Sequence, residues 1–577
     1  MDAASILSDR SESVYNVDGA APNHAGQAGD ARTHHRTNAY VVALLCLLNF
    51  ICTFDGTVLS TAITAIAQDI QGSTLEAFWT NTSLSLSSTV SQPFWIRLAD
   101  EMDRLGMTLC ALALFTLGSS MALLADSFAL LIAARTAQGF GIGGLTALTN
   151  IIVLDLVTSR ESGALLGWVN SVRALGSACG PVVGAALSQH RTWRWAFWVN
   201  VPFAMLAFMS APSLLRNTER VGVLRARDAL KRIDWLGALL LLASLTGFLV
   251  PLTWGGILFD WISPHTLLPM SLCAAGLAGF ALYSKRVPRQ PIMRGALFSS
   301  AHGIVAHCGA LVHGVAIFSL LYYLPLYYTI AKEASAAQAA LYVLPNTVIA
   351  ALASAASGIL VSKTGRYRIL LWVGWATTTL GSGILTVVTD RMTVAVSVAL
   401  SLVSGAGIGV LFTTLSLAAQ ASVSAADASA ASSMTNFFRS LGQTMGIAVG
   451  GVVVQNVFRS VVEASEVYRP YAAAWARNIA RVAQALKAAT GAGKEDLEDV
   501  IVPAIVKSTR AVWIFLCVLS ATQLALSIIC IKDLSLDGSD AVSEDRSATL
   551  KTSRLVISQP QLHRPFTDPA AASSFVR

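Results

Sequence analysis

Apolar runs of about 18–25 residues recur along almost the whole of this 577-residue chain. A run of that length crosses the hydrocarbon core of a bilayer, about 30 Å thick, as a single helix. Charged residues make up only 13% of the sequence and mean hydropathy is +0.60, whereas a soluble domain carries about 25% charged residues. The pattern therefore predicts an all-α polytopic membrane protein and excludes a soluble fold.

Glycine, proline and charged residues divide the apolar runs into fourteen predicted spans. They lie near 40–66, 76–96, 107–125, 128–157, 163–188, 194–214, 234–254, 265–284, 302–330, 337–361, 369–389, 393–420, 428–457 and 509–531. Residues 1–38 lack a signal-peptide pattern and are predicted to form a disordered arm. Residues 533–577, rich in Ser, Asp and Pro, are predicted to form a disordered tail.

The lysines and arginines of the short loops predict the orientation, because cytosolic loops carry an excess of positive charge. With a cytosolic N-terminus, the inner loops hold Arg97, Arg104, Arg160, Arg216, Arg220, Arg225, Arg227, Lys231, Arg232, Lys285, Arg286, Arg289, Arg294, Lys363, Arg366 and Arg368. The short outer loops hold only Arg191, Arg194, Lys332 and Arg391. Both termini are therefore predicted to be cytosolic. The long segment 459–508 is predicted to lie outside, as an amphipathic helix against the headgroups or packed on the protein.

Asp55 is the only charged residue between Val41 and Ala67, although a charge at bilayer depth costs about 2.5 kcal/mol or more. At 1.5 Å per residue it lies about 22 Å from the cytosolic start of its span. Arg135, in the fourth predicted span, lies about 12 Å below the outer surface, which is a similar depth. We predict that the two residues are partners. In one interpretation the pair takes part in proton coupling or contacts the substrate. In the other it is a static ion pair that fixes two helices.

Several motifs in a fixed order resemble those of the major facilitator superfamily, specifically its fungal drug:proton antiporters with fourteen spans. In the first half they are "FDGTVLSTAITAIAQDI", "QPFWIRLADEMDRLGM", "ARTAQGFGIGGL", "GSACGPVVGAAL" and "TWRWAFWVNVP". In the second half they are "RIDWLGALLLLASL", "YYLPLYY", "GILVSKTGRYR" and "SSMTNFFRSLGQTMGIAVGG". The resemblance covers about residues 39–460 and the last span.

The resemblance implies two six-helix bundles, 39–214 and 301–532, that rock around a central site, with a two-helix hairpin inserted within 215–300. It also implies a monomer in the plasma membrane. Its partners would be a small-molecule substrate, protons and the lipid bilayer, without nucleic acid and without a cofactor.

The resemblance also assigns roles to individual residues. It assigns Arg135 to proton coupling and places an exporter-type seam between the halves at Gly176, Gly180, Pro181 and Gly184. Small residues at this spacing equally serve plain helix packing. In the loop between spans 2 and 3, which locks the halves together, it matches Asp100 and Arg104, whereas Ile96, Asp103 and Leu105 depart from the pattern.

Arg173 is a second departure, because the family usually has an uncharged residue at this position of the fifth span. It lies about 15 Å into the span, within about 20° of Gly180 and Gly184 on the helical wheel. Two interpretations stay open. Arg173 is either a cavity cation that favours anionic or carbonyl-rich substrates, or it pairs with Asp155 or reaches toward the cytosol.

Five further residues are candidates for the wall of the cavity: Gln138, His313, Tyr323, Phe438 and Arg439. The tyrosines around Pro325 would stack on a flat substrate or form an interfacial aromatic belt. His302, His307 and His313 do not show the ligand spacing of a metal site, and no metal is predicted.

We expect a proton-coupled antiporter that exports amphiphilic small organic molecules such as secondary metabolites, toxins or drugs. The alternatives are proton-coupled uptake of a nutrient or metal chelate, and a membrane sensor that binds without transport. The sequence offers no nucleophile–base, metal or phosphate constellation that would support an enzyme. The net charge of +7 fits positive cytosolic loops rather than nucleic-acid binding.

Overall fold

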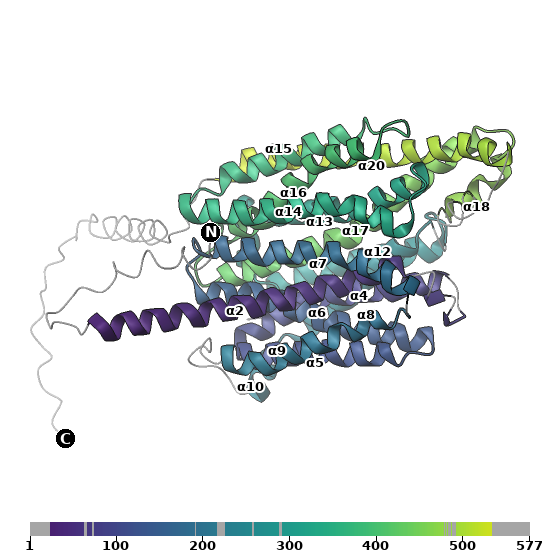
Figure 1. Cartoon of the computed structure of the whole chain (residues 1–577). Coiled ribbons are helices and arrows are strands. Elements are labelled where there is room, and N and C mark those ends of the chain that lie inside the picture. The colour runs from purple at the N-terminus through teal and green to yellow at the C-terminus, as the bar shows by residue number, and fades with distance from the viewer. Residues whose placement is uncertain are drawn as a thin grey trace, which may run out of the picture. The chain divides into compact units, whose positions relative to one another are not determined.

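In the computed structural model of the chain, the regular structure of the described residues is helical, apart from an isolated bridge between Gly255 and Phe259 (Figure 1). The described residues are 24–62, 66–67, 69–71, 74–190, 192–215, 226–256, 259–287, 291–477, 479, 482, 486 and 492–532. The predicted tail and residues 1–23 of the predicted arm lie outside these ranges.

The first half of the chain forms six long helical segments. They are α2 (His24–Val58) with the short η1 (Leu59–Thr61), α4 (Thr74–Glu101), α5 (Arg104–Leu123), α6 (Phe128–Leu156), α7 (Ser162–His190), and α8 (Trp195–Trp198) followed by α9 (Asn200–Leu215). Helix α2 begins before the first predicted span, and its membrane-compatible part is Ala39–Thr61. The side chains of Asp103 and Ser127 cap the N-termini of α5 and α6, which explains why these helices begin there.

The second half also forms six long helices, after a connecting region. The connection consists of α10 (Ala226–Arg232), α11 (Trp235–Trp254), α12 (Pro264–Arg286) and η3 (Gly295–Phe298). The helices that follow are α13 (Ala301–Ala331), α14 (Ala336–Thr364), α15 (Arg368–Leu385), α16 (Val394–Ala421), α17 (Ala428–Glu463) and α20 (Ala492–Cys530). Between α17 and α20 lie η4 (Arg469–Tyr471) and α18 (Ala472–Arg477).

Eleven helices within the described ranges are long and apolar enough to cross a membrane. The three other predicted spans fall on α4, α7 and α15. Helices α4 and α7 are less apolar because they carry polar side chains that lie inside the protein, such as Ser91, Gln92, Asn170 and Arg173.

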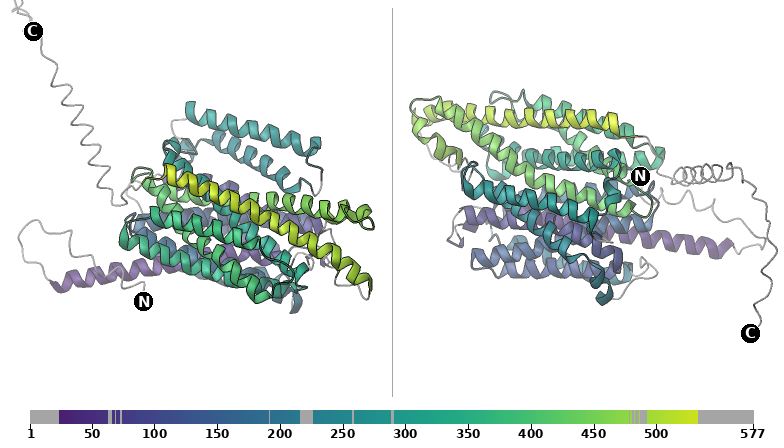
Figure 2. Two further views of the ribbon diagram at one scale, coloured as in Figure 1. Left: turned by 90° about the horizontal axis from the view of Figure 1, so that it is seen from above. Right: turned by 180° about the vertical axis from the view of Figure 1, so that it is seen from behind.

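The helices lie lengthwise beside one another, and the two halves meet along α7 with α14 and along α17 with α4 and α6 (Figure 1). Helices α11 and α12 pack against each other along one side of the bundle, as the view from above shows (Figure 2). Among the described elements, α11 of this pair contacts the halves through α4 and α17, whereas α12 packs mainly on α11.

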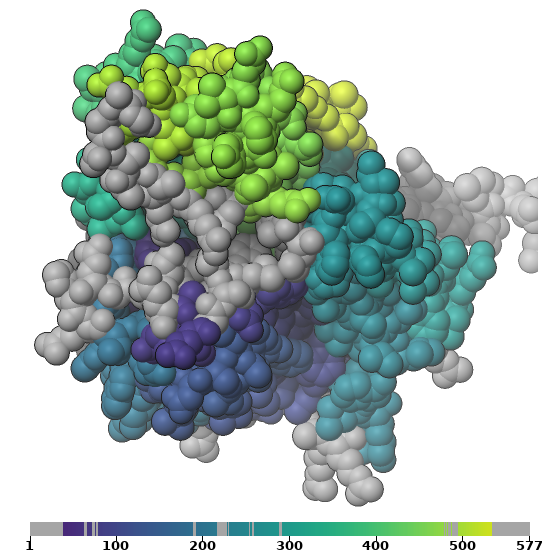
Figure 3. Space-filling view, turned by 90° about the vertical axis from the view of Figure 1, so that its right-hand side faces the viewer, coloured from purple at the N-terminus to yellow at the C-terminus, as the bar shows by residue number. Residues whose placement is uncertain are grey.

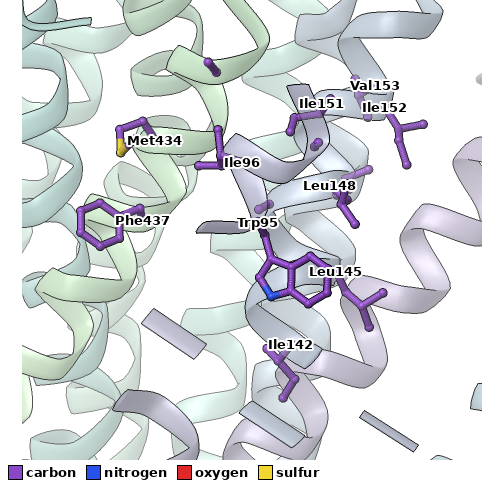
Figure 4. Packing of buried hydrophobic residues seen from close by; sticks show 14 of the residues in the cluster. Trp95, Ile96, Ile142, Leu145, Leu148, Ile151, Ile152, Val153, Met434 and Phe437 are labelled. Atoms are coloured by element: carbon purple, nitrogen blue, oxygen red, sulfur yellow. The ribbon is translucent and has the colours of Figure 1, made fainter. Parts of the chain in front are cut away.

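A continuous apolar core joins the halves. In the part shown in Figure 4, Trp95 and Ile96 of α4 lie between Met434 and Phe437 of α17 and a row of α6 side chains that includes Leu145 and Leu148. The indole nitrogen of Trp95 donates to the carbonyl oxygen of Phe140 at 2.9 Å, so that this buried polar group is satisfied. The core holds α4 and α6 as one unit against α17.

The bundle has two ends. At one, the Asp100 end, α4 ends and α5 begins. At the opposite α18 end, which Figure 3 faces, α17 ends and α20 begins.

The predicted loop 459–508 is shorter than expected, because α17 continues to Glu463 and α20 already begins at Ala492. Its described apolar residues pack on the protein, with Ala472 and Ala476 buried in one cluster with Phe458, Val462, Ile501 and Ile505.

At the α18 end, Asp69 in the connection before α4 binds the two residues that precede α8. The indole nitrogen of Trp193 donates to Asp69 at 2.9 Å and Arg194 Nη1 donates at 2.5 Å. The hydrogen bond from Trp193, followed by that from Arg194, holds the pKa of Asp69 below its ordinary value. The partly exposed pair ties the connection before α4 to the start of α8.

Candidate functional site

A buried carboxylate–guanidinium pair joins α2 to α6. Arg135 Nη1 lies 2.7 Å from Asp55 Oδ2, and neither side chain is exposed. Asp55 Oδ1 also accepts from Gln138 Nε2 at 3.0 Å and from Asn200 Nδ2 at 2.6 Å. The structure thus brings together the two charges that the sequence placed at equal depth, and surrounds the carboxylate with amide donors.

The pair is shielded from solvent. The Arg135 guanidinium also donates to the backbone oxygen of Asp55 at 3.2 Å and lies 5.5 Å from the centre of the Phe197 ring. Charge-assisted hydrogen bonds of this kind compensate for the loss of hydration of both ions. A carboxylate held in this way can hold or release a proton only when its surroundings rearrange, because no exposed surface of Asp55 is in contact with solvent.

The two halves enclose a central cavity of about 120 Å³. Its wall is built from α2, α4, α6 and α7 of the first half and from α13, α14, α16 and α17 of the second. Aromatic and aliphatic side chains such as Phe318, Phe412 and Ile142 alternate with uncharged polar ones such as Gln92 and Asn346. Such a mixed wall suits a small amphiphilic molecule.

A second cavity of about 170 Å³ adjoins the first and shares Thr57, Leu321, Val343 and Thr347 with it. Its other lining residues, Thr61, Tyr322, Pro325 and Ala336 among them, lie where α2 ends and α14 begins. The central cavity therefore continues toward the α18 end rather than toward the Asp100 end.

The five predicted cavity candidates are absent from the described wall of the central cavity. Gln138 is instead bound to Asp55 and to the hydroxyl group of Ser119. Tyr323 is buried against α17, where its hydroxyl donates to the carbonyl oxygen of Ile447 at 2.6 Å. Both side chains satisfy buried polar groups within one half of the protein, which turns them away from the cavity.

His313 and Arg439 form a second buried polar cluster, in the second half. Arg439 Nε donates to His313 Nδ1 at 3.2 Å, and Arg439 also donates to Asn436 Oδ1 and to the carbonyl oxygen of Phe412. His313 Nε2 lies 2.9 Å from the carbonyl oxygen of Ile408, so the neutral ring with its proton on Nε2 fits both contacts. Phe438 lies outside this cluster and stacks on His307, with ring centres 5.3 Å apart.

The glycines of the predicted exporter-type motif face α2 of their own half, not the seam between the halves. A Cβ atom on Gly180 would lie 2.9 Å from the carbonyl oxygen of Phe54, and one on Gly176 would lie 2.7 Å from that of Phe50. Gly184 meets the backbone of Val58, and the carbonyl oxygen of Pro181 accepts from Thr61 Oγ1 at 3.0 Å. The prediction that these residues form the seam between the halves is therefore wrong. The motif holds α7 close to the face of α2 that lines the cavity.

Other glycines form the seam between the halves, nearer the Asp100 end. Gly163 and Gly167 of α7 lie against Gly358 of α14, where a Cβ atom on Gly358 would lie 3.0 Å from Gly167 Cα. Arg160 donates to the carbonyl oxygens of Ser362 and Lys363 at 3.1 and 3.0 Å, close to the same crossing. Backbones in such close contact keep this end closed.

Asp100 takes part in a charged bridge that the sequence did not predict. Arg294, which precedes η3, lies 2.7 Å from Asp100 Oδ2 and also pairs with Asp427 at the start of α17. Arg104 is not part of this bridge, because its Nε donates to Asp155 Oδ2 at 2.8 Å within the first half. The bridge links the two halves through Arg294 at the closed end.

Arg173 is the only charged side chain on the described wall of the central cavity. It is 8% exposed. The predicted alternative partner, Asp155, pairs with Arg104 instead. Among the described residues, none forms a hydrogen bond or an ion pair with the Arg173 guanidinium. The predicted pairing of Arg173 with Asp155 is therefore wrong, whereas its reach toward the cytosol stays a prediction.

Sequence reasoning missed three polar residues that the structure places at these sites: Asn200, Gln92 and Arg294. Asn200 and Gln92 belong to the quoted segments "WVNVP" and "QPFW", so a buried amide within an apolar motif was the available signal. Arg294 had only the signal of an isolated cation before a span. No group of three or more His, Cys, Asp or Glu that could hold a metal ion occurs within the described ranges.

Comparisons with known proteins agree with this architecture. Residues 45–447 match the family model described as Major Facilitator Superfamily. The chain is 33% identical to "MFS transporter L2" from a Phoma species, over 84% of this chain and 80% of that protein. It is also 33% identical to "MFS-type efflux pump LUC4" from a Fusarium species, over 71% and 72% of the two chains.

Among solved structures, the proton:xylose symporter XylE superposes with a TM-score of 0.53 at 14% identity, over 87% of this chain and 98% of that chain. That likeness concerns the fold. The family and these neighbours are transporters and not enzymes. The chain therefore belongs to the Major Facilitator Superfamily, among relatives that are fungal transporters and efflux pumps.

Proposed function

We propose that the protein is a proton-coupled antiporter that exports amphiphilic small organic molecules by alternating access. The observation that carries the proposal is the fully buried pair of Asp55 and Arg135 on helices whose neighbouring residues line the central cavity. A carboxylate in this position can couple protonation to helix movement, because gain of a proton removes its attraction to Arg135. Relatives named as efflux pumps support the outward direction.

The energy supplied by a proton suffices for export. One proton that moves down about 100 mV and one pH unit releases about 3.7 kcal/mol. At one-to-one exchange this sustains roughly a 500-fold substrate gradient. In this proposal α4, α7 and α15 also cross the membrane, which gives fourteen spans with α11 and α12 as an inserted hairpin. The Asp100 end and both termini then face the cytosol, and the protein acts as a monomer in the plasma membrane.

The test is substrate movement in vesicles that contain the purified chain, driven by an imposed pH difference. We expect efflux of a fluorescent amphiphile to follow the pH difference and to be lost in Asp55→Asn. Asp126→Asn is the matched control, because that carboxylate is 95% exposed. Efflux that persists unchanged in Asp55→Asn contradicts the coupling role. Import under the same gradient would favour the uptake alternative, and binding without any flux would favour a sensor.

A further inference from the structure

The charge on the wall of the central cavity is unbalanced. Arg173 projects from α7 into the cavity, and the rest of the described wall carries uncharged side chains. Within the described residues, the guanidinium lacks both a hydrogen-bond acceptor and a carboxylate partner, although the side chain is more than nine-tenths buried. An arginine remains charged in proteins, so this charge is buried without compensation.

A second buried cation, Arg439, increases the imbalance, whereas the neutral ring of His313 does not compensate for it. Arg439 and His313 lie close enough to Arg173 to interact with it electrostatically. The only carboxylate nearby on α2 is Asp55, which is already bound to Arg135 on the far side of that helix. Arg439 satisfies its donors with neutral acceptors, namely Asn436, His313 and a backbone carbonyl oxygen. The potential in this part of the cavity is therefore positive.

A second group on the wall also lacks a partner. Gln92 Nε2 donates to Ser440 Oγ at 3.0 Å and to the carbonyl oxygen of Ser88. Gln92 Oε1 is buried and has no hydrogen-bond donor among the described residues. The wall thus carries one charged donor without a partner and one residue, Gln92, whose buried neutral acceptor lacks a partner, beside apolar rings such as Phe318 and Phe412. Buried groups of this kind are usually paired, which points to a bound molecule as the missing partner.

We propose that the central cavity binds an amphiphilic organic anion, whose carboxylate or delocalised oxyanion pairs with Arg173 and whose hydroxyl or N–H group donates to Gln92. This inference rests on the proposed function only in taking the central cavity as the substrate site. A planar guanidinium matches the two oxygens of a carboxylate, and the pairing removes the cost of its burial. A cationic amphiphile would meet an uncompensated positive charge in the same place and is disfavoured.

The test uses three probes with one apolar body and different head groups: 4-hexylbenzoate, 4-hexylbenzamide and 4-hexylbenzylammonium. Binding to the purified full chain in detergent is measured at neutral pH, after subtraction of binding to empty micelles. We expect the benzoate to bind about tenfold or more tightly than the benzamide, and the ammonium probe to bind weakest. Tighter binding of the amide or the ammonium probe, or no binding of the benzoate, overturns the proposal.

Variants locate the effect at one side chain. Arg173→Gln is expected to remove the preference for benzoate over benzamide, and Arg173→Lys to restore part of it. Arg391→Gln makes the same chemical change at an exposed position and should leave the preference intact. A preference retained in Arg173→Gln overturns the assignment. If Arg173→Gln does not fold, the ratio between the probes in the wild-type chain and in Arg173→Lys still decides the question.

This experiment is independent of proton coupling, because it measures equilibrium binding without a gradient. Selective binding of the benzoate without pH-driven flux would contradict the proposed antiporter and retain the anion site. Proton-driven export of cationic or neutral amphiphiles would do the reverse.

Discussion

Asp55 and Arg135 meet on the side of α2 that is turned away from the central cavity, while Cys52, Thr53 and Gly56 of the same helix line it. A movement of α2 against α6 would therefore change the ion pair and the cavity wall together. The buried ion pair and the central cavity are separate sites, and α2 contributes residues to both.

The ion pair predicts a strong coupling between two substitutions. Asp55→Asn or Arg135→Gln alone should lower the free energy of unfolding by about 3 kcal/mol, because each leaves the other group buried and unpaired. The double variant should lose clearly less than the sum of the two. Thermal or denaturant unfolding of the four proteins in detergent measures this cycle. Additive losses would show that the pair contributes no interaction energy.

The contact between α7 and α2 predicts that Gly180 tolerates no side chain. Gly180→Ala should destabilise the protein by about 1–3 kcal/mol, because the new methyl group meets the backbone at Phe54 and Val58. Gly279→Ala on α12 is the matched control, since nothing lies within 4 Å of its added Cβ atom. That change should be neutral or stabilise the helix by about 0.5–1 kcal/mol. Equal effects of the two substitutions on the unfolding midpoint would contradict the close approach.

The bridge from Asp100 through Arg294 to Asp427 predicts a gate at the Asp100 end. Arg294→Gln should increase the population that is open at this end, because two carboxylates from opposite halves lose their shared cation. Spin labels at the exposed positions Glu161 and Ala425, in a background without the native cysteines, report the separation by electron–electron resonance.

The matched control for this gate is Arg286→Gln, which removes an exposed cation from the end of α12. Its distance distribution should coincide with that of the parent protein. If Arg294→Gln also leaves the distribution unchanged, the bridge does not contribute to closure.

The contact of Asp69 with Trp193 and Arg194 predicts a pH-dependent contribution to stability. The pKa of Asp69 is lower in the folded protein than in the unfolded chain, so its stabilising effect is present above the ordinary carboxyl pKa. The effect is lost as the pH falls through the lowered value. The difference in unfolding midpoint between the wild type and Asp69→Asn should therefore be present at pH 7 and decrease progressively as the pH falls below the ordinary carboxyl pKa. A difference that does not change over this range would refute the pairing.

The sequence was sufficient for the helical framework and for the partnership of Asp55 with Arg135. Apolar length identifies a membrane helix directly, and a lone acid in hydrocarbon restricts its partner to a cation at the same depth. The helical wheel placed Arg173 on the same face as Gly180 and Gly184, but it could not show which helix or cavity that face meets.

The faces of the helices were harder to predict, as the exporter-type glycines illustrate. Gly180 and Gly167 lie on the same helix, and both allow a close approach, but one meets α2 and the other meets α14. Spacing shows that two helices touch and does not identify the partner helix. Tyr323 and Gln138 were misplaced for a related reason, because a buried polar group turns toward whichever acceptor the tertiary structure supplies.

Where Gly163 and Gly167 cross Gly358, the backbones of α7 and α14 are in direct contact, without a side chain between them that could change its rotamer. The distance between the two helices in the closed state is therefore fixed by the van der Waals radii of the backbone atoms. A larger residue at any of these three positions would separate α7 from α14, and the volume of its side chain would determine how wide the Asp100 end of the proposed transporter opens.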